Sequence, residues 1–266
     1  MQPDVSVMMA IPAAANAPVA ICPDRPLMPT SPLHYQNQLL AALPEEERRR
    51  LGVSLELVPL DYGQCLYEPG AQILDVFFPT TAIVSLLSDI EDGTTAETAA
   101  VGNEGIVGVT LFMGGETTLS RAMVYSPGHG YKLTGRILKG EFHRAGPLQR
   151  SLMRYTQALL AEMAQTLVCM RHHTLEQQFC RWLLRRFDRL SPQALVMSQE
   201  MIAQVLGVRR AAISEVAIGL RTAGLISYGR GRVNLLDRPG LEARSCACYA
   251  AIQGEFARLL PGGTGT

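Results

Sequence analysis

Two short amphipathic segments, 198–206 and 210–223, have apolar positions three or four residues apart, the spacing of one helix face. These positions are Met201, Ile202, Val205 and Leu206 in the first segment and Ile213, Val216, Ala217 and Leu220 in the second. Ser198 suits the N-cap of the first helix, and Gly207 supplies the left-handed residue that ends it. The pattern predicts a helix-turn-helix, whose second helix can lie in the DNA major groove. The alternative is an ordinary helical hairpin.

A predicted β-hairpin follows these two helices. The segment Ser227–Leu236 carries Gly-Arg-Gly near its centre, which is typical of a tight turn between strands. Beside a helix-turn-helix such a hairpin is a wing, and Arg230 and Arg232 are then placed to contact phosphate. The segment Pro239–Leu260 predicts one final helix.

From residue 53 to about residue 140 the pattern changes to short apolar and β-branched runs separated by glycines. Asp92-Gly93 is a hairpin signal within this region. Many short strands with frequent turn residues predict an all-β barrel or sandwich. The proline-rich segment 1–32 predicts a disordered tail, because repeated prolines remove backbone donors and disfavour helix.

A long helix is predicted from Pro147 to Met170, where one apolar stripe steps by three or four residues. Packing on the barrel and a two-stranded dimer seam both explain such a stripe. We favour the seam, since a helix-turn-helix generally acts as a dimer on two half-sites. The predicted seam residues are Leu152, Tyr155, Leu159, Met163, Thr166 and Met170.

Another helix is predicted from Thr174 to Leu190. Its expected core face consists of Leu175, Phe179, Trp182, Leu183 and Phe187. The arginines of this helix, Arg181, Arg185, Arg186 and Arg189, are expected largely outside that face.

The formal net charge is zero, but the charges are unevenly distributed. Residues 31–147 carry 8 Lys and Arg against 14 Asp and Glu, whereas residues 148–266 carry 15 against 8. A basic half that contains the helix-turn-helix is expected of a phosphate-binding region joined to a region with another task. The basic residues of this half are arginines, which suit bidentate contacts to phosphate or guanine.

The six cysteines are scattered and form no CxxC pair, which disfavours a zinc ribbon or a disulfide framework. Cys246-Ala247-Cys248 alone is too short a spacing to indicate a metal site. The N-terminus lacks the basic region of a signal peptide, and no apolar run approaches the roughly 18 residues of a membrane-spanning helix. We therefore expect reduced thiols, a cytoplasmic location and no membrane contact.

The order of these parts resembles the Crp/Fnr superfamily of bacterial transcription regulators over about residues 35–250. The specific stretches are LYEPG at 66–70, VGNEGIVG at 101–108 and SQEMIAQVLGVRRAAISEVAIGLRTAGLISYGRGRV at 198–233. The resemblance implies an α+β fold: an N-terminal antiparallel β-roll of the cyclic-nucleotide-binding-like jelly-roll type, a long dimerisation helix and a C-terminal winged helix-turn-helix. The expected parts are a tail (1–32), a β-roll sensor domain (33–146), a dimerisation helix (147–171), a DNA-binding domain (172–250) and a C-terminal tail (251–266).

In the predicted recognition helix, Arg210 occupies the position of the family arginine that donates to guanine O6 and N7. Ala211 stands where the family often has Glu, and Glu215 where it often has Arg, so the target sequence should differ. Ala211 offers only a methyl contact to thymine, whereas Glu215 is an acceptor for cytosine N4 or a partner for a neighbouring Arg. The predicted phosphate contacts are Ser198, Gln199, Arg209, Ser214, Arg230 and Arg232.

The possible effector pocket, Gly108, Ser120 and Arg121, departs from the family pattern. Cyclic-nucleotide-binding members carry a Gly-Glu pair for the ribose and an Arg followed by Ser or Thr for the phosphate. Here Val109 follows Gly108, and Ser120 stands at the arginine position with Arg121 displaced by one. A shift of one residue on a strand turns a side chain to the opposite face, and Glu104-Gly105 only reverses the pair. Cyclic AMP is therefore not expected to bind by the usual contacts.

Other cofactors of the family are not expected either. An iron–sulfur member needs four cysteine ligands, three of them clustered near the N-terminus, where only Cys22 stands. The five histidines, His34, His129, His143, His172 and His173, form no haem pattern, and His172 and His173 suit a helix C-terminus. We expect no metal and no enzyme activity.

The expected partners are double-stranded DNA and a second copy of the chain, with RNA polymerase a further candidate and the effector unknown. The alternative is a small-molecule-binding or cupin-like β-barrel protein with a degenerate DNA-binding domain. A cupin site needs several His and a Glu converging in the barrel, and the barrel offers only His129 and His143 without an HxH pair.

Overall fold

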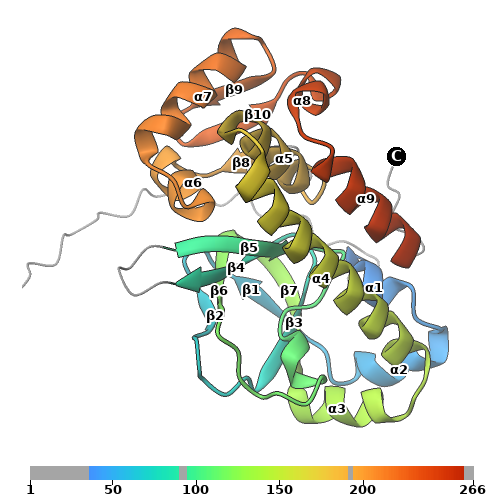
Figure 1. Cartoon of the computed structure of the whole chain (residues 1–266). Coiled ribbons are helices and arrows are strands. Elements are labelled where there is room, and N and C mark those ends of the chain that lie inside the picture. The colour runs from blue at the N-terminus through green and yellow to red at the C-terminus, as the bar shows by residue number, and fades with distance from the viewer. Residues whose placement is uncertain (1–35, 90–94, 191–193, 261–266) are drawn as a thin grey trace, which may run out of the picture. The chain divides into compact units, whose positions relative to one another are not determined.

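The computed structural model describes residues 36–89, 95–190 and 194–260 (Figure 1). The predicted N-terminal tail and the Asp92-Gly93 turn lie outside these residues. The described residues have the predicted α+β architecture, with antiparallel sheets first, a long helix next and a helix-turn-helix with a β-wing last.

Two antiparallel sheets form the β-roll, in the strand orders β1-β7-β3 and β2-β6-β4-β5. The strands are β1 (Glu56–Leu60), β2 (Cys65–Tyr67), β3 (Asp75–Pro79), β4 (Ile83–Asp89), β5 (Thr95–Val101), β6 (Arg121–Ser126) and β7 (Gly128–Thr134). A short 3-10 turn, η2 (Val109–Leu111), lies between β5 and β6.

The register of the larger sheet brings β-branched residues together in the core. Val84 of β4 pairs with Val101 of β5 on one side and with Val124 of β6 on the other. All three valines are fully buried, as expected where branched side chains pack on a pleated surface. The core of the β-roll also takes in residues of the long helix.

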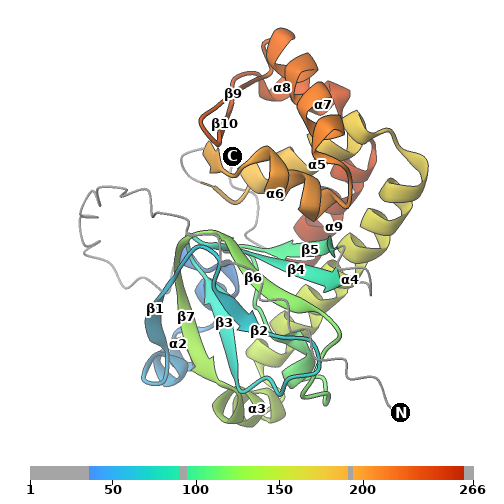
Figure 2. The same cartoon turned by 90° about the vertical axis from the view of Figure 1, so that its left-hand side faces the viewer.

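Four helices flank the β-roll. They are α1 (Gln38–Ala41), α2 (Glu45–Gly52), α3 (Gly135–His143) and the long α4 (Pro147–His172). Pro147 begins α4, where a missing backbone N–H costs nothing. Figures 1 and 2 both show α4 running beside β5 and against the C-terminal helix α9 (Cys248–Leu259).

The inner face of α4 corrects the predicted dimer seam. Leu152, Tyr155 and Leu159 are at most 2% exposed and belong to the core of the chain's own β-roll. Thr166 is also buried, Met163 packs against the same core, and only Met170 of the predicted set is exposed. The stripe therefore serves the packing of α4 on the β-roll, the alternative that the sequence left open.

The C-terminal region begins with α5 (Leu175–Phe187), which Thr174 starts with a capping box to Gln177. It continues with β8 (Ala194–Val196), α6 (Gln199–Leu206), α7 (Arg210–Thr222), β9 (Ile226–Gly229) and β10 (Arg232–Leu235). These last two strands form the predicted hairpin, and β8 pairs with β10 to complete a three-stranded sheet.

The predicted final helix is two helices, α8 (Arg238–Arg244) and α9, separated at residues 245–247. Asp237 caps α8 by accepting from the Gly240 backbone N–H, and the extended backbone of Ser245 ends this helix before α9 begins. Among the described residues, no helix has the length and apolar character needed to span a membrane.

Candidate functional site

The junction of α6 and α7 has the geometry that the sequence predicted. The Ser198 hydroxyl caps α6 by accepting from the Met201 backbone N–H at 3.2 Å. Gly207 ends α6 in the left-handed region with φ 65°, and Gly224 follows α7 with φ 73°. Ile213, Ala217 and Leu220 bury the inner side of α7. This packing fixes which side of α7 faces outward.

The outward side of α7 carries the predicted base-contacting residues. Arg210 is the first residue of the helix, and its side chain is 66% exposed. Ala211 and Glu215 are exposed one turn apart. Ile218, at 53% exposure, extends the same side and was not predicted. The first turns of α7 thus present a guanidinium, a methyl group and a carboxylate, the group types that read base edges in the major groove.

The predicted phosphate-contacting residues fall into two groups. Arg209, Arg230 and Arg232 are exposed, the first at the N-cap of α7 and the others at the wing. Gln199 and Ser214 bond to each other, since the Ser214 hydroxyl donates to Gln199 Oε1 at 2.7 Å.

The wing and α7 enclose a cleft with a positive lining. Arg210, Arg221 and Arg230 line it together with Ser198 and Gln199 at the start of α6. Arg230 holds the hairpin tip in the left-handed region with φ 52°, next to Gly231 with φ 72°. Arg221 was not predicted, although it follows Arg210 by eleven residues, about three helical turns along the same face. The cleft is therefore suited to a polyanion.

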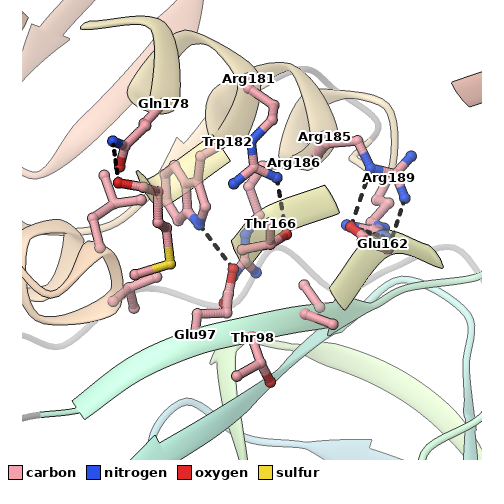
Figure 3. Close-up of a pocket in the computed structure, with 15 residues that line it drawn as sticks. Glu97, Thr98, Glu162, Thr166, Gln178, Arg181, Trp182, Arg185, Arg186 and Arg189 are labelled. Atoms are coloured by element: carbon pink, nitrogen blue, oxygen red, sulfur yellow. Dashed lines mark hydrogen bonds and ion pairs between the residues drawn. The ribbon is translucent and has the colours of Figure 1, made fainter. Parts of the chain in front are cut away.

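A buried charge network lies where β5, α4 and α5 meet (Figure 3). Glu162 of α4 accepts from Arg185 at 3.2 and 3.0 Å and from Arg189 at 3.4 and 3.2 Å. Burial alone raises the pKa of Glu162, but Arg185 and Arg189 outweigh it and lower that pKa to about 2. The carboxylate is therefore ionised although it is almost completely buried.

The same network reaches the β-roll at two further carboxylates. Arg189 Nε donates to Glu104 Oε1 at 2.8 Å, in the loop after β5. Glu97 of β5 accepts from the Trp182 indole N–H at 2.9 Å and from Arg186. Arg186 also donates to Ser85 of β4 at 2.8 Å.

The arginines of α5 were expected largely outside the core face. Arg181, Arg185, Arg186 and Arg189 are instead all at most 8% exposed. They are therefore part of the internal connection between the C-terminal region, α4 and the β-roll.

Comparison with known proteins agrees with this geometry. Residues 177–244 match the family model of the Crp-like helix-turn-helix domain. The solved structure of FixK2 from Bradyrhizobium japonicum superposes with a TM-score of 0.62 and 17% identity, covering 73% of this chain and 98% of that one. Residues 177–244 therefore form a Crp-like helix-turn-helix domain, and the chain has the fold of FixK2.

Two further solved structures have the same fold. TTHB099, a CRP-family transcriptional regulator from Thermus thermophilus, has a TM-score of 0.58 and 21% identity, covering 71% of this chain and 96% of that one. CLP of Xanthomonas campestris, described as a c-di-GMP-responsive global regulator, has a TM-score of 0.58 and 14% identity, covering 72% and 99%. No curated protein matches the sequence. The predicted fold class is confirmed, and the predicted helix-turn-helix is matched by the Crp-like domain model.

The residues predicted for a Crp/Fnr effector pocket have other partners. Arg121 Nε lies 2.7 Å from a Glu68 oxygen, and its Nη2 lies 3.2 Å from Asp89. Gly108 has φ 100° and precedes the η2 turn, so Val109 begins a turn that packs against the core. The backbone N–H of Ser120 donates to Thr118 Oγ1 at 3.2 Å. Arg121, the only cation of the three, is thus already neutralised by two carboxylates.

One group of side chains does not support the expectation that the chain has no metal site. The ligand atoms of Cys169, His173, Cys246 and Cys248 all lie within 4.8 Å of one another, and the three cysteines are buried. Such a set is able to hold a metal ion. The sequence signal was two close pairs, CxxxH and CxC, but they stand more than 70 residues apart and nothing in the spacing joins them.

Among the described residues, His129 and His143 belong to no comparable group. A cupin-like site in the β-roll, the alternative considered from the sequence, therefore has no support from these two histidines.

Proposed function

We propose that the chain acts as a homodimer that binds double-stranded DNA sequence-specifically, with α7 in the major groove. The exposed Arg210 at the start of α7 carries this proposal, because a guanidinium there reaches guanine O6 and N7 as a fork. Ala211 and Glu215 then contact neighbouring base pairs. Since Ala211 offers a methyl group and Glu215 an acceptor, thymine and cytosine are their preferred contacts.

Phosphate contacts fix the position of α7 on the DNA. Arg209 at the start of α7 and Arg230 and Arg232 at the wing are exposed cations, and Arg230 lines the α7 cleft. Ser198 and Gln199 lie at the start of α6, and Ser214 lies in the second turn of α7 and bonds to Gln199. Hydroxyls, amides and the backbone N–H groups of a helix start bond phosphate oxygens. These contacts position the protein and carry no sequence information themselves.

The dimer forms through the outer face of α4. Met153, Leu160 and Leu167 follow one another at intervals of seven residues and are 59%, 57% and 71% exposed. Gln157 and Ala164 lie between them on the same exposed side. An exposed heptad stripe on a long helix favours a two-stranded seam, and the dimer places two recognition helices on two half-sites.

Regulation of this chain does not use the contacts by which family members bind cyclic AMP. The carboxylate after Gly108 is replaced by Val109, and Arg121 is paired with Glu68 and Asp89. Glu104, the nearest carboxylate in that loop, is directed to Arg189 of the C-terminal region. The proposal also includes a cytoplasmic location, RNA polymerase as a partner and an effector other than cyclic AMP. It keeps the domain limits 33–146, 147–171 and 172–250.

Selection of bound sites from random duplex DNA tests the proposal. A homodimer should enrich a two-fold symmetric sequence with a guanine at equivalent positions of both half-sites. Its affinity for that sequence should fall steeply with salt, because bound phosphates release counterions. Enrichment of no sequence, or of one asymmetric half-site, would contradict specific dimeric binding.

A further inference from the structure

The Cys169–His173–Cys246–Cys248 cluster is assembled from both sides of the DNA-reading region. Cys169 and His173 stand one helical turn apart at the end of α4, where the His173 backbone N–H donates to the Cys169 carbonyl at 3.0 Å. Cys246 lies between α8 and α9, and Cys248 is the first residue of α9. The winged helix-turn-helix lies between these two pairs in the sequence. A ligand bound by all four residues would therefore join the entry and the exit of that region.

Two distances within the cluster are close to those of a tetrahedral thiolate site. Bonds of about 2.3 Å to sulfur and about 2.0–2.1 Å to nitrogen separate two sulfurs by about 3.8 Å and a sulfur and a nitrogen by about 3.5 Å. The Cys169 and Cys246 sulfurs are 3.5 Å apart, and Cys248 Sγ lies 3.4 Å from His173 Nδ1. Only small side-chain shifts are needed to surround one ion. Cys169, Cys246 and Cys248 are free thiols, so all three sulfurs are available to bind an ion.

Two polar side chains act on the ligands of the cluster. Gln165, one turn before Cys169, donates its amide N–H to Cys248 Sγ at 3.1 Å, the kind of outer hydrogen bond that orients a metal ligand. Arg181 of α5 is also buried and acts electrostatically on Cys169.

The charge balance of the interior leads to the same result. The network of α5 contains four buried guanidinium groups, Arg181, Arg185, Arg186 and Arg189, and three carboxylates, Glu97, Glu104 and Glu162. Arg181 donates to the Thr166 hydroxyl at 3.2 Å, and among the described residues it makes no ion pair with a carboxylate. A divalent ion with three thiolates and a neutral imidazole carries one negative charge. Such a site would offset the remaining positive charge of Arg181.

We propose that Cys169, His173, Cys246 and Cys248 bind one zinc ion tetrahedrally. This ion would link the segment that follows the wing to the end of α4. Zinc is the divalent ion that three cysteines and one histidine in a closed site suit best. Each thiol gives its proton to solvent on binding, and no oxidant or reductant is required. The inference rests on this cluster alone and does not depend on the proposed DNA contacts.

Metal analysis of the full-length chain tests the proposal. After dialysis against zinc and removal of excess, the wild-type chain should retain one zinc ion per chain. Cobalt in place of zinc should give the intense sulfur-to-cobalt charge-transfer absorption and the visible bands of a tetrahedral site. The matched control is Cys65→Ser, because Cys65 is a half-buried thiol on β2 outside the cluster. This control should keep both signals, whereas Cys248→Ser should weaken zinc binding more than about 100-fold, beyond the effect of an outer-ligand change.

A second measurement on the wild-type chain guards against misfolding of the variant. Because an ion that binds only the folded state stabilises it, a strong chelator should lower the Tm and added zinc should restore it. Absence of zinc uptake by a folded wild-type chain would overturn the proposal. Equal uptake by Cys248→Ser, an octahedral cobalt spectrum, or a Cys169–Cys246 disulfide in metal-free protein purified without oxidant would also overturn it.

Discussion

Arg189 lies 2.8 Å from Glu104, and both side chains are about nine-tenths buried. Glu104 belongs to the loop that follows β5, whereas Arg189 stands just beyond α5 at the entry to the DNA-reading region. The same guanidinium donates to Glu162 of α4. One side chain thus contacts the β-roll, the long helix and the C-terminal region.

Removing this guanidinium should destabilise the protein strongly. Arg189→Met leaves Glu104 without its charged partner and Glu162 with Arg185 alone. Removing one partner of a buried ion pair costs about 3–5 kcal/mol of stability. Urea unfolding of the wild type and of Arg189→Met measures this difference. Arg258→Met is the matched control, because Arg258 pairs with Glu255 on the surface of α9; its midpoint should stay at the wild-type value. Equal midpoints for all three chains would show that the buried pair contributes nothing.

The stability of the protein should depend on acid through Glu162. The folded-state pKa of this carboxyl is about 2, below its ordinary value of 4.5. The stabilisation is therefore complete above the unfolded pKa of about 4.3 and is lost as the pH falls towards 2. A shift of this size is on the order of 3 kcal/mol. The free energies of unfolding of the wild type and Glu162→Gln should therefore converge below about pH 4.3. If their difference is the same at pH 6 and pH 3, Glu162 is not the titrating group.

The outer face of α4, not the inner one, should control the oligomeric state. Leu160 is 57% exposed and its neighbour Leu159 is 2% exposed. Leu160→Asp should give a folded monomer in sedimentation velocity, since it places a charge in the proposed seam. Leu159→Ala should leave the dimer intact and cost about 2–5 kcal/mol of stability, as truncation of a buried leucine does. A Leu160→Asp chain that still sediments as a dimer would place the seam elsewhere.

The local signals of the helix-turn-helix were sufficient to predict where its helices begin and end. Ser198, Gly207 and Gly224 mark helix ends through their own capping and backbone preferences, and these effects act within a few residues. The observed helix ends and the β-wing follow them closely. The family resemblance rested on the same stretch, which the Crp-like domain model also covers.

The buried charges and the cysteine cluster were missed because their partners are distant in sequence. Arg189 and Glu104 are separated by 85 residues, and Cys169 and Cys246 by 77. No periodicity within a helix reports such pairings. The basic composition predicts a DNA-facing surface, whereas four of the arginines neutralise carboxylates or line the core inside the molecule.

The choice between the two faces of α4 also required the tertiary structure. Apolar residues occur on both sides of this helix, at Leu152, Tyr155 and Leu159 and again at Met153, Leu160 and Leu167. Their spacing is helical in both cases, so the pattern alone does not distinguish the β-roll from a partner chain. Burial of the first set decides it.

The central claim is that Arg210 reads a base from the start of α7, and its most direct test is the affinity of Arg210→Ala for two duplexes. Binding to the selected site should weaken by about 1–3 kcal/mol with relaxed preference at one guanine, while binding to random duplex should change little. Arg232→Ala, on the wing, should weaken binding to both duplexes by a similar factor. It should also reduce the slope of log affinity against log salt concentration by about one. An equal loss for Arg210→Ala on the selected and the random duplex would contradict a base-reading role.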